Sequence, residues 1–61
     1  MPILHVSIAA GRSDEMVENF IREVIKTTSA TLNAPESAVT VIVNQIPHTH
    51  LAVAGKLKSE S

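Results

Sequence analysis

The chain has 61 residues, no cysteine and a formal net charge of −1, from five basic and six acidic side chains. This length predicts a single domain, residues 1–61, near the size at which one hydrophobic core is marginal. The lack of cysteine excludes a disulfide framework, thiolate metal sites and a cysteine nucleophile. Scattered basic residues and a single aromatic side chain, Phe20, argue against nucleic acid as a partner.

Apolar side chains make up 44% of the chain but aromatic ones only 2%, so the apolar surface comes from small and aliphatic residues spread along the sequence. No apolar run reaches membrane-spanning length, and the amino-terminal segment lacks the basic start and long apolar stretch of a signal peptide. We therefore expect a cytoplasmic protein with no membrane contact. One small layer of structure leaves this much apolar surface uncovered, which predicts an obligate oligomer.

The first predicted element is a β-strand over residues 3–10, ILHVSIAA, where apolar and other side chains alternate. Its aliphatic face consists of Leu4, Val6 and Ile8, and its other face of Ile3, His5 and Ser7. Gly11 ends this strand.

A helix follows. Ser13 is a suitable N-cap, and Asp14 and Glu15 lie in the first turn, where acidic groups favour the positive end of the helix dipole. Residues of a predominantly apolar face then recur at helical spacing, at Val17, Phe20, Ile21, Val24, Ile25, Thr28 and Leu32. Asn33 suits a left-handed cap, and Pro35 prevents the helix from continuing past Ala34.

Residues 39–46, VTVIVNQI, predict a second strand with two faces that both look at least partly buried. One face holds Val39, Val41 and Val43, and the other holds Thr40, Ile42, Asn44 and Ile46. Strand, helix and strand in this order predict a right-handed βαβ unit with parallel strands. One helix covers only one face of such a sheet, so we expect the other face to meet a second subunit.

The carboxyl-terminal part begins at Pro47, which ends the second strand. HTH then predicts a turn, LAVAG a short extended segment or hairpin ended by Gly55, and the polar tail KLKSES a frayed end. The predicted fold class is therefore α/β (α+β), a βαβ unit with parallel strands plus a short carboxyl-terminal strand or hairpin.

Few residues are candidates for chemistry. The serines have no nucleophile-elbow context, and the chain has only two glycines, Gly11 and Gly55, so it has no glycine-rich phosphate loop. His48 and His50 are two residues apart, but no third ligand is evident, which favours two solvated histidines over a metal site. His5 is better explained as a hydrogen-bonded interface residue than as a base.

Pro2 and Arg12 are the remaining candidates for chemistry. By position alone, Pro2 is an ordinary first residue of a strand, because proline has no amide hydrogen to donate to a sheet. An arginine between a strand and a helix is usually solvated or paired with an acid. Arginine is also the preferred partner of a carboxylate, because its planar guanidinium donates two parallel hydrogen bonds.

Residues 2–56 resemble the 4-oxalocrotonate tautomerase subgroup of the tautomerase superfamily. The features that carry the resemblance are Pro2 after the initiator methionine, GRSDE at 11–15, IREV at 21–24, NAP at 33–35, and H-x-A-V-A-G at 50–55. GRSDE opening a helix at this distance from an amino-terminal proline is fairly specific, and the chain length also matches.

The resemblance implies a cofactor-independent, metal-free isomerase. Removal of Met1 would leave Pro2 with a free secondary amine that acts as general base and then general acid, moving a proton between carbons of an enol or dienol 2-keto acid. An apolar site with the Pro2 nitrogen beside Arg12 would lower the pKa of that amine into the useful range. Arg12 would hold the substrate carboxylate or enolate oxygen, with Thr40, Leu51 and Ala9 as further substrate-binding residues. The resemblance also implies a homo-oligomer, most simply a hexamer.

Two departures from the subgroup affect this interpretation. Thr40 stands where the subgroup carries a second arginine, and Leu51 where it carries an aromatic residue. A smaller or monocarboxylic enol acid therefore fits better than a dicarboxylate. Three alternatives stay open: a hetero-oligomer whose other subunit supplies the missing groups, a non-catalytic subunit, and a haloacrylate dehalogenase or hydratase. For the last of these, Val53 stands where the resemblance would place the water-activating acid.

Overall fold

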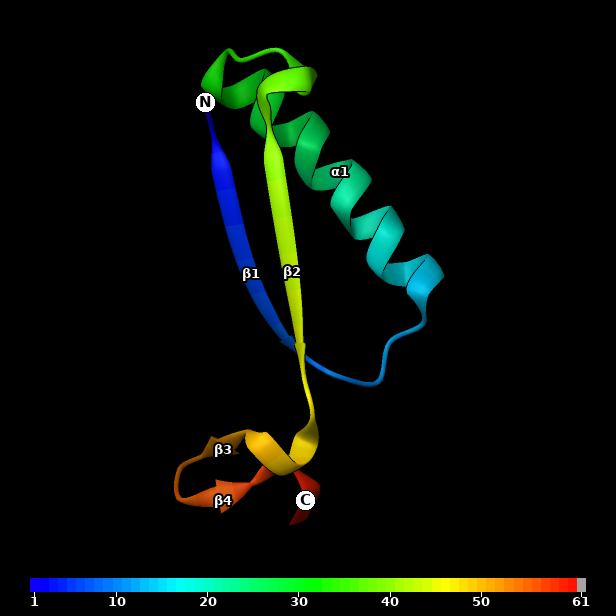
Figure 1. The fold of residues 1–61 in the computed structure, drawn as a ribbon, viewed down its shortest axis with the longest axis vertical. Coiled ribbons are helices and arrows are strands. Elements are labelled where there is room, and N and C mark those ends of the chain that lie inside the picture. Colours follow the sequence, from blue (N-terminus) through cyan, green and yellow to red (C-terminus); the bar gives the residue numbers. More distant parts are fainter. Residues whose placement is uncertain (61) are drawn as a thin grey trace.

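The computed structural model describes residues 1–60, and its main unit is a parallel pair of strands covered by one helix. The elements are β1 (Ile3–Ala9), α1 (Asp14–Leu32), β2 (Thr40–Ile46), β3 (Ala52–Val53) and β4 (Lys56–Leu57), with 3₁₀ turns at Glu36–Ala38, His48–His50 and Lys58–Glu60. β1 and β2 are parallel, and β3 and β4 form a separate antiparallel hairpin at the far end of the molecule (Figure 1). The predicted βαβ unit with a carboxyl-terminal hairpin is confirmed.

The ends of α1 follow from the predicted capping residues. The Ser13 side chain accepts a hydrogen bond from the Met16 amide at 3.2 Å, and Asp14 and Glu15 occupy the first turn. Asn33 adopts the left-handed conformation, with φ 54° and ψ 49°, and its amide donates to the Ser29 carbonyl. Across residues 1–60, no helix combines the length and the apolar character that crossing a membrane requires.

The register of the parallel pair determines which side chains share a face. Ile3 lies opposite Thr40, Val6 opposite Val43 and Ala9 opposite Ile46. Leu4, Val6 and Ile8 are half-buried and their strand neighbours Ile3, His5 and Ser7 are exposed, as the alternation predicts. Each strand is one residue shorter than expected: the chain turns at Gly11 after Ala10, and the Val39 amide bonds to Glu36 in the preceding 3₁₀ turn.

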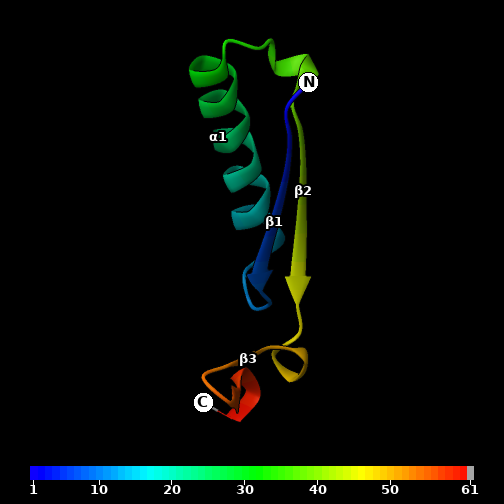
Figure 2. The same ribbon diagram turned by 90° about the vertical axis from the view of Figure 1, so that its left-hand side faces the viewer.

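A single chain has almost no interior. Among residues 1–60 only Thr28 is buried, at 7% exposure, and no apolar residue is. α1 lies on one face of the strand pair and leaves the other face open (Figure 2). On that open face Ile42 is 42% exposed and Asn44 is also exposed, whereas Thr40 and Ile46 are half-buried, so one chain covers this face only in part and its contact with a second subunit stays a prediction. Phe20 and Leu32 also stay exposed at the edges of the helix.

The carboxyl-terminal segment is more ordered than expected. Lys56–Leu57 forms β4 and pairs with β3, with Ala52 opposite Leu57 and Val53 opposite Lys56. Gly55 therefore lies in the turn, where its φ of +81° suits glycine, and does not end the hairpin. The Lys58 amide donates to the Leu51 carbonyl at 2.7 Å. The prediction that the tail frays is wrong for residues 56–60, which form β4 and a 3₁₀ turn, and residue 61 lies outside the described residues.

Candidate active site

Pro2 and Thr40 lie together where both parallel strands begin. The Thr40 amide donates to the Pro2 carbonyl at 2.9 Å, and Ile3 is the register partner of Thr40. Both residues are half-buried. Met1, which precedes the proline, is 90% exposed, so the end of the chain is open to solvent. The sheet thus fixes the backbone of Pro2 beside Thr40.

Arg12 lies beyond the other end of β1, in the connection to α1. Its Nη1 donates to the carbonyl of Ala9 at 3.3 Å, and its side chain is exposed. Gly11 makes the turn possible, because its φ of +129° is unfavourable for a residue with a side chain. Arg12 forms no ion pair within residues 1–60, since the two ion pairs there join Arg22 to Glu18 and Lys26 to Glu23 along α1. Its charge is therefore available to an anionic ligand.

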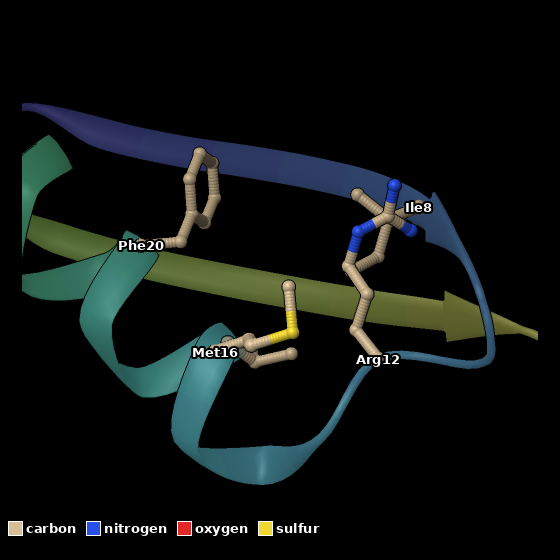
Figure 3. Close-up of a pocket in the computed structure, with 5 residues that line it drawn as sticks. Ile8, Arg12, Met16 and Phe20 are labelled. Atoms are coloured by element: carbon tan, nitrogen blue, oxygen red, sulfur yellow. The ribbon is translucent and has the colours of Figure 1, made fainter.

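The Arg12 guanidinium borders an apolar cavity between β1 and the first turns of α1. The cavity has a volume of about 310 Å³ and is lined by Ile8, Arg12, Met16, Val17 and Phe20 (Figure 3). A cavity with one guanidinium and an otherwise apolar lining can bind a ligand that has one carboxylate and an apolar remainder. These apolar residues are not among the site residues that the sequence predicts. Their spacing at 16, 17 and 20 was the available signal, because it places them on one side of the helix start.

The structure does not bring all of the predicted site residues together. Pro2 and Arg12 flank opposite ends of β1, whose seven residues span roughly 20 Å at the usual rise per residue. Within one chain the Pro2 nitrogen therefore does not lie beside Arg12, and the expected proximity of the two groups stays a prediction about the assembly. Leu51, half-buried, lies past the carboxyl end of β2, so in one chain the predicted site residues fall into two groups, called partial sites below. Pro2 and Thr40 form the first, and Ala9, Arg12 and Leu51 lie toward the opposite end.

The two neighbouring histidines differ in their contacts. His48 Nε2 lies 2.6 Å from the carbonyl oxygen of Ala10, 38 residues away in sequence. The His50 side chain is exposed and makes no hydrogen bond within residues 1–60. In the same range, no three potential ligands among histidine, cysteine, aspartate and glutamate lie close enough to hold a metal ion.

Comparisons with known proteins agree with one another. The model of the family described as tautomerase enzyme matches residues 2–61. A 2-hydroxymuconate tautomerase of Stutzerimonas stutzeri is 43% identical over 56 residues, covering 92% of this chain and 89% of that protein. The structure of apo unfused 4-OT superposes with a TM-score of 0.94 at 30% identity over 100% of both chains. The structure of a heterohexamer 4-oxalocrotonate tautomerase from Chloroflexus aurantiacus superposes with a TM-score of 0.93 at 28% identity, covering 98% of this chain and 97% of that chain.

Proposed function

The chain belongs to the tautomerase family and is an isomerase, and on this premise we propose that Pro2 is its proton carrier. The substrate is an enol or dienol 2-keto acid, and no cofactor takes part. The observation that carries the proposal is the position of Pro2, which is half-buried at the first residue before β1 and held by its carbonyl against Thr40. Ketonisation of phenylenolpyruvate by the wild-type protein and by Pro2→Ala tests it.

The chemistry needs a free amine at Pro2. Removal of Met1 turns the Pro2 nitrogen from an amide into a secondary amine with a basic lone pair. The neutral amine takes the proton from the enol or dienol, and the resulting ammonium returns it to a carbon of the same molecule, so the enzyme is regenerated. The strand pairing keeps the nitrogen in a fixed position for both transfers.

Arg12 acts on the same substrate from a second copy of the chain. Its guanidinium binds the carboxylate or the developing enolate oxygen, and Ala9 and Leu51 contribute to the wall near it. A second copy is needed because Pro2 and Arg12 are separated by the length of β1. When the Arg12 end of one copy meets the Pro2 end of another, the two partial sites form one.

The shape and surface of the subunit support an oligomer. The radius of gyration is 14.4 Å, whereas a compact chain of this length has about 10 Å. The accessible surface is 4611 Å², against about 3,800 Å² for a monomer of this mass. A structural neighbour, the Chloroflexus protein, is a heterohexamer. We propose a homo-oligomer, a hexamer, for this chain, and a hetero-oligomer is the alternative outcome of measuring its assembly.

Thr40 limits the charge that the site offers to a substrate. Thr40, whose backbone amide bonds to Pro2, carries a neutral hydroxyl, and Arg12 is the cation of the other partial site. A monocarboxylic enol acid satisfies this arrangement, whereas the second carboxylate of a dicarboxylate would lie without a charged partner. The proposed substrate class is therefore a monocarboxylic enol acid.

The variant Thr40→Arg tests this substrate preference. A charge-assisted hydrogen bond contributes about 1.5–3 kcal/mol, so kcat/KM for 2-hydroxymuconate should rise by roughly ten- to a hundredfold. The kcat/KM of the same variant for phenylenolpyruvate should change by less than about twofold. Thr40→Gln, which is long but neutral, is the matched control. If kcat/KM for 2-hydroxymuconate rose equally in Thr40→Arg and Thr40→Gln, the added positive charge would not be the cause.

A further inference from the structure

The segment that carries Arg12 is held to the end of β2 through Ala10. The Ala10 amide donates to the Ile46 carbonyl at 2.9 Å, and the Ala10 carbonyl lies 2.6 Å from His48 Nε2. A carbonyl oxygen only accepts, so His48 Nε2 carries the hydrogen and donates it. Both polar groups of the Ala10 backbone are therefore bonded to the chain that leaves β2.

The segment is fixed on its other side by the start of the helix. Ser13 caps α1 through its side chain, and its carbonyl accepts the Val17 amide at 3.1 Å. Only residues 11 and 12 lie between the Ala10 contacts and this cap. Gly11 has no side chain to restrict its own backbone. The two hydrogen bonds at Ala10 are therefore what limits the movement of the chain just before Arg12.

We propose that His48 is a positioning residue for Arg12. The imidazole holds the Ala10 carbonyl and so fixes the start of the loop from which the guanidinium extends. This inference rests on the proposed role of Arg12 in binding substrate. His48 itself does not touch the substrate in this account. Pro47, with φ −58°, precedes it and gives the ring a rigid attachment at the end of β2.

The geometry predicts an effect on substrate binding that passes through Arg12. When a group that binds the substrate is displaced even slightly, the substrate loses its productive orientation and the rate falls strongly. Without the imidazole donor, the Ala10 carbonyl is left to water and the guanidinium samples more positions. Substrate binding should weaken, while the proton transfer at Pro2, on the other partial site, should change less.

The test uses His48→Leu, which removes the donor, and His48→Gln, whose amide retains one at similar reach. His50→Leu is the matched control in the same 3₁₀ turn. With phenylenolpyruvate, we expect His48→Leu to raise KM and lower kcat/KM about tenfold with a smaller change in kcat, and the other two variants to stay within about twofold. In an Arg12→Ala background, His48→Leu should lower kcat/KM by less than about twofold, because residues that act as a unit are not additive.

Two results would overturn the proposal: wild-type kinetics in His48→Leu, or an equal loss in the wild-type and Arg12→Ala backgrounds. Hydrogen exchange of the Ala10 amide separates this failure from failure of the proposed function. If Arg12→Ala keeps wild-type kcat/KM, the proposed role of Arg12 and the positioning role of His48 both fail. Faster exchange of the Ala10 amide in His48→Leu than in His48→Gln would then still support the inference that the imidazole holds Ala10 against the end of β2, and equal exchange would overturn that inference as well.

Discussion

Pro2→Ala should lower kcat for ketonisation of phenylenolpyruvate by about a hundred- to ten-thousandfold, the usual contribution of a positioned acid–base group. Alanine at this position ends in a primary amine on a freely rotating backbone. The proline ring holds the nitrogen at a fixed φ at the entry to β1. The expected loss is therefore in the proton transfer itself and appears mainly in kcat.

The control for this substitution is Pro35→Ala, in the connection between α1 and β2, five residues before Thr40 and not among the residues proposed to bind substrate. It should keep wild-type kcat within about twofold, because no proton transfer depends on it. Both variants should keep the wild-type assembly by size-exclusion chromatography. Wild-type kcat in Pro2→Ala would contradict the account. So would an intact mass that retains Met1 on a fully active protein, because an acylated nitrogen has no basic lone pair.

Ile42→Glu should prevent assembly. Ile42 and its register partner His5 lie on the sheet face that α1 leaves open, and Ile42 is 42% exposed in one chain. If a second copy covers this face, each subunit would bury a carboxylate beside the His5 imidazole, and the desolvation cost of several kcal/mol per ion can exceed what such a buried pair returns. Because residues 1–60 include no buried apolar side chain, a single subunit has little stability of its own. We expect loss of the oligomer by analytical ultracentrifugation together with loss of helical circular dichroism and of activity.

Ala30→Glu is the matched control for the introduced charge. Ala30 is exposed, and helical spacing places it opposite the half-buried Val17, Ile21 and Val24. This variant should sediment and unfold like the wild type, since a surface carboxylate there loses no hydration. If Ile42→Glu sediments with the wild type as well, the open sheet face is not the interface.

Much of the fold could be predicted from local chemistry. Ser13 and Asn33 mark the ends of α1 because their side chains and backbone preferences act within one turn of the chain. The alternation of Leu4, Val6 and Ile8 gave the covered face of β1 for the same reason. β4 was missed because the pairing of Lys56 with Val53 depends on hairpin register, which polar composition does not indicate.

The site was harder to predict than the fold. The resemblance assigned roles to Pro2 and Arg12 but not the subunit from which each comes. The length of the first strand was already visible in the sequence and was enough to separate the two residues within one chain. The hydrogen bond between His48 and Ala10 joins residues that are close only because β1 and β2 pair in parallel register. No local sequence pattern therefore predicts it.

The central claim is that Pro2 and Arg12 of one active site belong to different copies of the chain. Pro2→Ala and Arg12→Ala proteins, each nearly inactive alone, can be unfolded, mixed in equal amounts and refolded. Random assembly gives about one quarter of the sites an intact Pro2 from one variant and an intact Arg12 from the other, so about a quarter of wild-type kcat/KM should return. If the mixture stays as inactive as the two variants refolded separately, both residues act within one chain or not together, and the account is wrong.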